Sequence, residues 1–214
     1  KIGKKYKIPI IEDNAQTMLG RYKGRYVGVR TEMSMFSLER TKHISSHEGG
    51  LLLSNSKTLT EKARKFGGGG FKNLSADKSK MAAVIPLEFQ SPDFKRHDAL
   101  GLNYRISEFC AAIALGQFEK VDQKVKLRRD VANLYSKVFK KFPQFQPQYV
   151  PKFYHHSYFT YSVKSPFSKL KDWKKFYNFQ IKNKGDYFYA MMSPVYSEQI
   201  MKKIVYEKKY KKLC

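Results

Sequence analysis

Short apolar runs followed at once by polar residues recur in the first part of the chain. Residues 8–11 (IPII) precede Glu12 and Asp13, residues 33–38 precede a polar stretch, and residues 51–53 are three consecutive leucines. Runs of this kind are typical of strands that are buried in a mostly parallel sheet and carry polar residues at their carboxyl ends. We therefore expect three buried strands here.

Helical patterns follow the strands. Thr58 and Glu61 have the spacing of a capping box and predict a short helix over residues 55–66. Ser107 is a candidate N-cap for a long helix whose apolar stripe runs on to Phe142, with a bend on the way. We also expect a strand over residues 157–163 and an amphipathic helix around residues 170–181. Strands that alternate with helices predict an α/β fold.

Two features divide the chain. Four glycines at residues 67–70 open a long connection that reaches about residue 100, and a loop of that length is usually functional or an insertion. Pro143 and Pro147 end the long helix. We expect the domain boundary there, with one domain over residues 1–143 and a second over residues 144–214.

The net charge is the strongest compositional signal. The chain of 214 residues carries a formal charge of +24, which first suggests a polyanionic partner such as a nucleic acid. The excess is mostly lysine and is spread over the chain, whereas phosphate and guanine recognition favours clustered arginine. A nucleic-acid-binding module therefore stays an alternative, and we expect no nucleic-acid partner.

The sequence gives even less support for a disulfide-bonded, metal-binding, membrane or secreted protein. Cys110 and Cys214 cannot form a disulfide framework or a zinc site, so we expect no metal and a reduced, cytoplasmic setting. No apolar run approaches the roughly 20 residues of a membrane span, and no signal peptide is visible. The chain begins with Lys1 instead of a methionine, and its first residues read as the tail of a helix. We therefore expect the chain to be a fragment.

Candidate chemistry lies at the ends of the expected strands, where open α/β sheets bind ligands. Asp13 and Gln16 follow the first strand, Ser37 and Lys42 follow the second, and a Glu-Gly-Gly turn precedes the third. A lysine amine can form a Schiff base with the aldehyde of pyridoxal phosphate, and a carboxylate can keep the pyridine nitrogen protonated. Hydroxyls and backbone amides can hold the phosphate.

Four ordered stretches carry a family resemblance. They read IPIIEDNAQTMLGRYKGRYVG, MFSLERTKHISSHEGGLLLSN, KRHDALGLNYRISEFCAAIALGQFEKVD and VPKFYHHSYFTYSVK. Together they resemble the DegT/StrS-type pyridoxal-phosphate-dependent nucleotide-sugar aminotransferases. The resemblance implies the aspartate-aminotransferase-like (fold type I) architecture, with a three-layer αβα large domain on a mixed, mostly parallel sheet and part of a smaller α+β domain.

The same resemblance implies a role for each candidate residue. Asp13 would pair with the pyridine nitrogen, and Gln16 would lie against the cofactor ring. Ser37 would bind the phosphate. Lys42 would form the Schiff base and then move the proton between cofactor and substrate. Asn103 would reach the phosphate of a neighbouring subunit, which implies a homodimer with a shared active site.

The implied reaction transfers an amino group from an amino acid, glutamate by expectation, to a keto group of a nucleotide-linked deoxysugar in polysaccharide or related amino-sugar biosynthesis. Some members of the family have histidine at the position of Lys42 and act as sugar dehydratases. This chain has Lys42 there and His43 beside it, which favours transamination and leaves the dehydratase as the alternative.

The chain also departs from the family pattern. His47 stands where a small or apolar residue is usual, and Arg40 replaces a frequent proline. The family's N-terminal phosphate loop and ring-stacking aromatic residue are not in the sequence, so this chain by itself is expected to be inactive, and a catalytically dead remnant stays open. We interpret His43 and His97 as structural or solvent-facing and His155 and His156 as rim residues.

Overall fold

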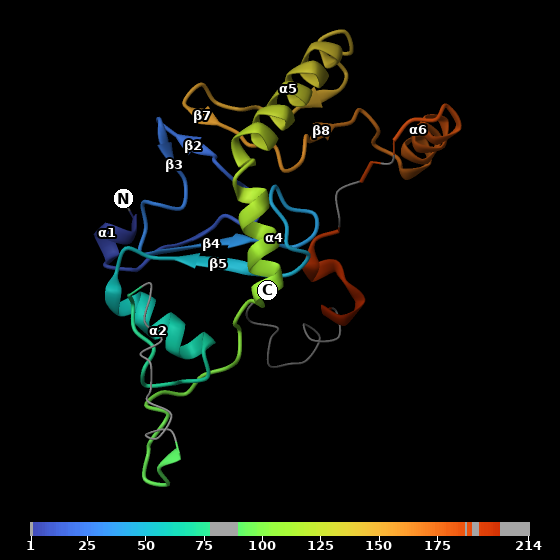
Figure 1. Ribbon diagram of the computed structural model, residues 1–214. Coiled ribbons are helices and arrows are strands. Elements are labelled where there is room, and N and C mark those ends of the chain that lie inside the picture. Colours follow the sequence, from blue (N-terminus) through green and yellow to red (C-terminus); the bar gives the residue numbers. More distant parts are fainter. Residues whose placement is uncertain (1, 78–89, 187, 190–192, 202–214) are drawn as a thin grey trace, which may run out of the picture. The chain divides into compact units, whose positions relative to one another are not determined.

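The computed structural model describes residues 2–77, 90–186, 188–189 and 193–201 (Figure 1). Contacts divide the chain into two compact units, Lys1–Ser165 and Pro166–Cys214. This division lies later in the chain than the boundary between residues 143 and 144 that the prolines indicate. The assignment of a large and a small domain to those segments stays a prediction.

A mixed three-stranded sheet forms the centre of the first unit. Its strands are β1 (Ile11–Asp13), β4 (Met33–Ser37) and β5 (Gly50–Leu53), in the order β1-β4-β5 (Figure 1). β1 pairs with β4 in parallel, and β5 pairs with β4 in the antiparallel direction. All three expected strands are therefore present. Because β1 and β4 are parallel, their polar carboxyl ends lie at the same edge of the sheet.

The expected burial of these strands is wrong for two of them. Ile11 is 60% exposed and Leu52 is 52% exposed, whereas Ser34 in the central strand is 1% exposed. The reason is their position, because β1 and β5 are the outer strands of this sheet among the described residues. An apolar run thus predicts a strand well, but its burial depends on what packs against it.

A second sheet joins distant parts of the chain. The hairpin of β2 (Arg21–Tyr22) and β3 (Arg25–Tyr26) pairs with β7 (Tyr154–His155) in the order β3-β2-β7. The hairpin turn places Lys23 at φ 50° and Gly24 at φ 76°, and positive φ at both central residues matches the right-handed twist of the flanking strands.

The strand expected over residues 157–163 is wrong. The structure has β7 before this segment and β8 (Val163–Lys164) at its end, where β8 pairs with β6 (Gln146–Pro147). Carbonyl groups inside the segment accept hydrogen bonds from side chains instead of a neighbouring strand. Arg128 Nη1, for example, donates to the Tyr158 and Phe159 oxygens at 3.1 and 3.2 Å.

Four helices belong to the first unit in its described part. They are α1 (Ile2–Tyr6), α2 (Lys57–Gly67), α4 (Glu108–Phe118) and α5 (Val121–Phe139). Ser107 caps α4 as predicted, since its Oγ accepts from Cys110 N at 3.2 Å. The capping box predicted for α2 is wrong, because Ser56 caps the helix and its Oγ accepts from Leu59 N at 3.3 Å.

The buried core lies where the loop after β4 meets the beginning of α5. Leu38 is fully buried and Ile44 is 1% exposed, and both cluster with Met18, Val121 and Val125. The α4 side chain of Gln117 fixes the same loop, because its Oε1 accepts from the backbone N of Ser45 at 3.1 Å. This packing holds the loop that carries Lys42.

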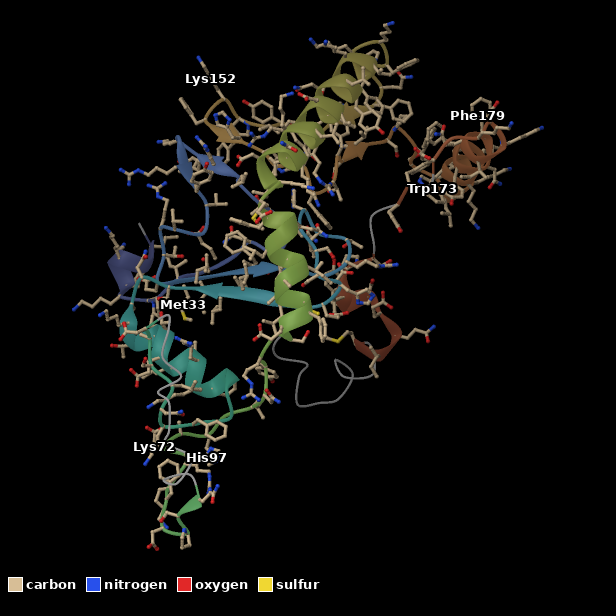
Figure 2. The ribbon with its side chains drawn as sticks, viewed as in Figure 1. Met33, Lys72, His97, Lys152, Trp173 and Phe179 are labelled. Atoms are coloured by element: carbon tan, nitrogen blue, oxygen red, sulfur yellow. The ribbon has the colours of Figure 1, made fainter. Side chains whose placement is uncertain are left out.

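The glycine run and the end of the long connection also meet in the first unit. Phe71 and His97 lie with their ring centroids 4.5 Å apart, near Lys72 (Figure 2). His97 Nδ1 lies 2.8 Å from the Gly69 oxygen, which agrees with a structural role for this histidine. The expected connection includes residues 78–89, which lie outside the described residues.

The second unit contains α6 (Leu170–Lys182), as the amphipathic pattern predicts, and a short 3₁₀ helix, η1 (Val195–Ser197). Figure 2 labels Trp173 and Phe179 on α6. Trp173 stacks on Tyr177 with centroids 5.2 Å apart, and Phe188 packs against both rings. Phe179 is 64% exposed, so the aromatic cluster covers one face of the helix only.

Candidate active site

Asp13 is the last residue of β1 and lies next to the central strand. Its backbone pairs with Met35 of β4, and the following amide, Asn14 N, donates to the Met35 oxygen at 2.9 Å. The carboxylate is exposed, and Oδ1 accepts from Ala15 N at 2.9 Å, which fixes the turn after the strand. Asp13 lines an open hollow of about 310 Å³ together with Thr17, Arg21, Tyr154, His155 and His156.

Ser37 is the last residue of β4 and is half-buried. Its Oγ accepts from Glu39 N at 3.2 Å. It lines a second hollow of about 310 Å³ with Ala15, Gly49 and Gly50. Gly49 has φ 128°, and an added Cβ would lie 2.9 Å from Ile106 Cδ1, so the turn beside Ser37 requires glycine.

Lys42 lies in the loop between β4 and β5 and is half-buried. Its Nζ lies 4.6 Å from the centre of the Phe159 ring. Glu39 comes three residues earlier, and its Oε2 accepts from the amide and hydroxyl of Thr41 at 2.9 and 2.6 Å. The hydrogen bonds from Thr41, together with the charge of Lys42, hold the pKa of Glu39 below its usual value.

His43 is the buried neighbour of Lys42. It is 5% exposed, and its Nε2 lies 3.0 Å from the Ser157 oxygen. Burial lowers the pKa of His43, and the charge of Arg128 adds to this effect. The Ser157 hydroxyl in turn lies 2.9 Å from Thr17 Oγ, so Ser157 joins the segment after β1 to the loop that carries Lys42.

The structure brings together only part of the predicted set. Asp13 and Ser37 end adjacent strands, and Ala15 shares the hollow of Ser37. Lys42 lines neither hollow. Gln16 is exposed, and Asn103 is exposed and forms an isolated backbone bridge with Gly68. The roles assigned to these five residues stay predictions.

Sequence reasoning missed the residues that hold the site together. Phe159, Ser157 and Arg128 were not assigned to it, and each lies more than 80 positions from Lys42 along the chain. No local spacing could have revealed them. The one available signal was the pair of arginines, Arg128 and Arg129, on an otherwise lysine-rich helix, since arginine can bind two carbonyls at once.

The mixed sheet with its helices has the fold of the pyridoxal-phosphate-dependent aminotransferases of fold type I, as predicted. The structure of PseC from Helicobacter pylori, described as an aminotransferase involved in pseudoaminic acid biosynthesis, superposes with a TM-score of 0.75 at 23% identity over 95% of this chain and 50% of that chain.

The chain belongs to the DegT/DnrJ/EryC1/StrS aminotransferase family, whose model matches residues 1–212. The predicted family is thereby confirmed. GDP-perosamine synthase of Escherichia coli O157:H7 is 31% identical over 154 residues, which are 72% of this chain and 37% of that protein. EpsN of Bacillus subtilis strain 168, named as a pyridoxal phosphate-dependent aminotransferase, is 30% identical over 67% of this chain and 33% of that protein.

The chain therefore spans about a third of the length of the curated relatives it matches and about half of the PseC chain. Within the described ranges, no helix is both long and apolar enough to cross a membrane. Nor does that part of the chain contain a group of three or more histidine, cysteine, aspartate or glutamate side chains placed to hold a metal ion.

Proposed function

We propose that the protein to which this chain belongs is a cytoplasmic, pyridoxal-phosphate-dependent aminotransferase that moves an amino group from an amino acid to a keto group of a nucleotide-linked deoxysugar. Glutamate is the proposed donor, and the product would serve polysaccharide or related amino-sugar biosynthesis. Family membership and the names of the relatives support the reaction class.

The donor set of this chain fits the cofactor in chemical type. Asp13 offers a carboxylate for a protonated pyridine nitrogen, Ser37 offers a hydroxyl for a phosphate, and Lys42 offers a primary amine for an aldehyde. Gln16, three residues after Asp13 in the sequence, would lie against the cofactor ring. Bound pyridoxal phosphate would supply an electron sink for the carbon that exchanges its amino group. Lys42 would bind the cofactor through its aldehyde and then move the proton between cofactor and substrate.

One observation carries the choice of transamination over dehydration. His43 is buried with Nε2 against the Ser157 oxygen, whereas Lys42 keeps its Nζ over an aromatic ring and outside a hydrogen bond to a carboxylate in the described contacts. The amine, and not the neighbouring imidazole, is therefore the group available for Schiff-base chemistry and for proton transfer.

The test uses the full-length protein that contains this chain. A Lys42→Ala variant should lose the reducible Schiff-base absorption of the wild type while it still folds. Retention of that absorption would overturn the proposal. Incubation with a nucleotide-linked keto sugar and glutamate then separates the two reactions, because an amino sugar supports transamination and a deoxygenated keto sugar supports the dehydratase.

The proposed partners are the nucleotide sugar, the amino-acid donor and a second copy of the protein. If Asn103 reaches the cofactor phosphate of a neighbouring subunit, inactive Lys42→Ala and Asn103→Ala proteins should regain activity when their subunits are mixed, because one site of each mixed dimer is intact. Mixing without any recovery would contradict a shared site. The charge of +24 would favour recruitment of the substrate diphosphate.

A further inference from the structure

Phe159 lies beside the proposed reactive amine. The Lys42 Nζ is 4.6 Å from the centre of its ring, within the roughly 6 Å over which an aromatic face attracts an ammonium group. The same ring lies 6.1 Å from the centre of the His43 imidazole. Phe159 is half-buried, so the contact is partly shielded from water.

Arg128 fixes the backbone that carries this ring. From α5, its Nη1 donates to the Tyr158 oxygen at 3.1 Å and to the Phe159 oxygen at 3.2 Å. One residue further along the helix, Arg129 Nε donates to the His156 oxygen at 2.9 Å. Among the described residues, residues 156–161 have no strand partner, and these charge-assisted bonds take the place of a ladder.

The loop that carries Lys42 is also held in place. Leu38 and Ile44 are buried on either side of Lys42 in the sequence, and His43 is bonded to the Ser157 oxygen. The nearby carboxylate of Glu39 accepts hydrogen bonds from Thr41 through Oε2. The loop and the aromatic ring are thus held in place from two sides, and the lysine side chain lies between them.

We propose that Phe159 is a positioning residue for Lys42: its ring holds the side-chain ammonium in place, and Arg128 holds the ring. The proposal deepens the function proposed above, because it matters for the reaction only if Lys42 is the reactive amine. A ring below Nζ restricts the side chain to one region, whereas an aliphatic side chain would leave it free.

The experiment measures the amine itself. The full-length protein, freed of pyridoxal phosphate, is methylated with formaldehyde and a hydride donor, and mass spectrometry follows the rate at Lys42 relative to the exposed Lys152. Phe159→Leu should raise the relative rate about two- to five-fold, the factor that corresponds to an exposed cation–π contact. Phe159→Tyr keeps the ring and should behave as the wild type.

A pair of α5 variants tests the anchor. Arg128→Gln should raise the rate at Lys42, by less than Phe159→Leu. Lys126→Gln removes the same charge from an exposed side chain that pairs with Asp130 at 2.6 Å and should leave the rate unchanged. If Phe159→Leu does not fold, as judged by its near-ultraviolet circular dichroism, the two α5 variants carry the test.

The proposal is overturned if Lys42 reacts at the wild-type rate in folded Phe159→Leu, if Phe159→Tyr reacts as fast as Phe159→Leu, or if Arg128→Gln and Lys126→Gln behave alike. These rates do not depend on the assigned reaction. A Lys42→Ala protein that keeps its Schiff-base absorption would overturn the proposed function and leave the ring contact standing.

Discussion

His43 Nε2 lies 3.0 Å from the carbonyl oxygen of Ser157, although the two residues are 114 positions apart in the chain. This contact joins the loop after β4 to the segment between β7 and β8. It also buries a titratable ring immediately beside Lys42. The stability of this part of the molecule should therefore depend on the protonation of His43.

We predict that the protein loses stability as the pH falls below about 6.5. Burial lowers the pKa of His43 from its ordinary value of 6.5, so the folded state keeps the ring neutral where the unfolded state takes up a proton. The stabilisation is complete above the unfolded pKa and is lost as the pH falls toward the lowered folded pKa. Urea unfolding from pH 8 to pH 5 measures this slope.

The His43→Gln variant provides the control for that slope. It should be less stable than the wild type at pH 8, and the difference should narrow as the pH falls, because glutamine does not titrate. Burial and the charge of Arg129 lower the pKa of His156 as well. This effect is the same in the wild type and in the variant, so it does not change the difference between their slopes. Equal slopes for the two proteins would show that His43 does not contribute.

A second prediction concerns Gly28, where the chain passes close to the end of β1. Gly28 has φ 82°, and an added Cβ would lie 2.7 Å from the Phe36 ring and 3.0 Å from Asn14 Nδ2. Its amide donates to Glu12 Oε2 at 2.6 Å, so the backbone cannot easily shift. Gly28→Ala should cost roughly 1–3 kcal/mol for overpacking, in addition to about 1–2 kcal/mol for the left-handed backbone.

Gly24→Ala is the matched control for Gly28→Ala. Gly24 has a similar φ of 76°, but an added Cβ would meet no heavy atom within 4 Å. It should lose only the backbone component, about 1–2 kcal/mol. The two free energies of unfolding, measured with the same denaturant, should differ by the overpacking component, and equal losses would contradict the packing found at Gly28.

A third prediction tests the core beneath the Lys42 loop. Leu38 is fully buried and contacts the cluster that includes Val121 and Val125. Leu38→Ala should lower the free energy of unfolding by about 2–5 kcal/mol. Leu127→Ala, on the same helix as the two valines but 65% exposed, should change it by less than about 0.5 kcal/mol. A small effect at Leu38 would mean that the loop is held by something else.

A fourth prediction separates the two candidate caps of α2. Ser56 Oγ accepts from Leu59 N at 3.3 Å, so Ser56→Ala should cost about 0.5–2 kcal/mol. Thr58 lies inside the helix and is exposed, so Thr58→Ala should be neutral or slightly stabilising, because alanine has the higher helix propensity. Thermal unfolding of both variants decides between them, and a greater loss at Thr58 would favour the capping box.

Local patterns in the sequence were enough to determine much of this protein. Apolar runs mark β1, β4 and β5, Ser107 marks the beginning of α4, and the amphipathic stripe marks α6. The order of the motifs around Asp13, Ser37 and Lys42 was enough to identify the family. Such features depend on neighbours within a few residues, and these are fixed by the sequence itself.

Only the tertiary structure decided what surrounds those residues. It exposes Ile11 and Leu52, whose runs predict burial, because they lie on the outer strands of the described sheet. It turns residues 157–162 from a predicted strand into a segment bound by side chains, and it places Phe159 over Lys42. Burial and contacts of this kind depend on packing between distant parts of the chain, which no local spacing contains.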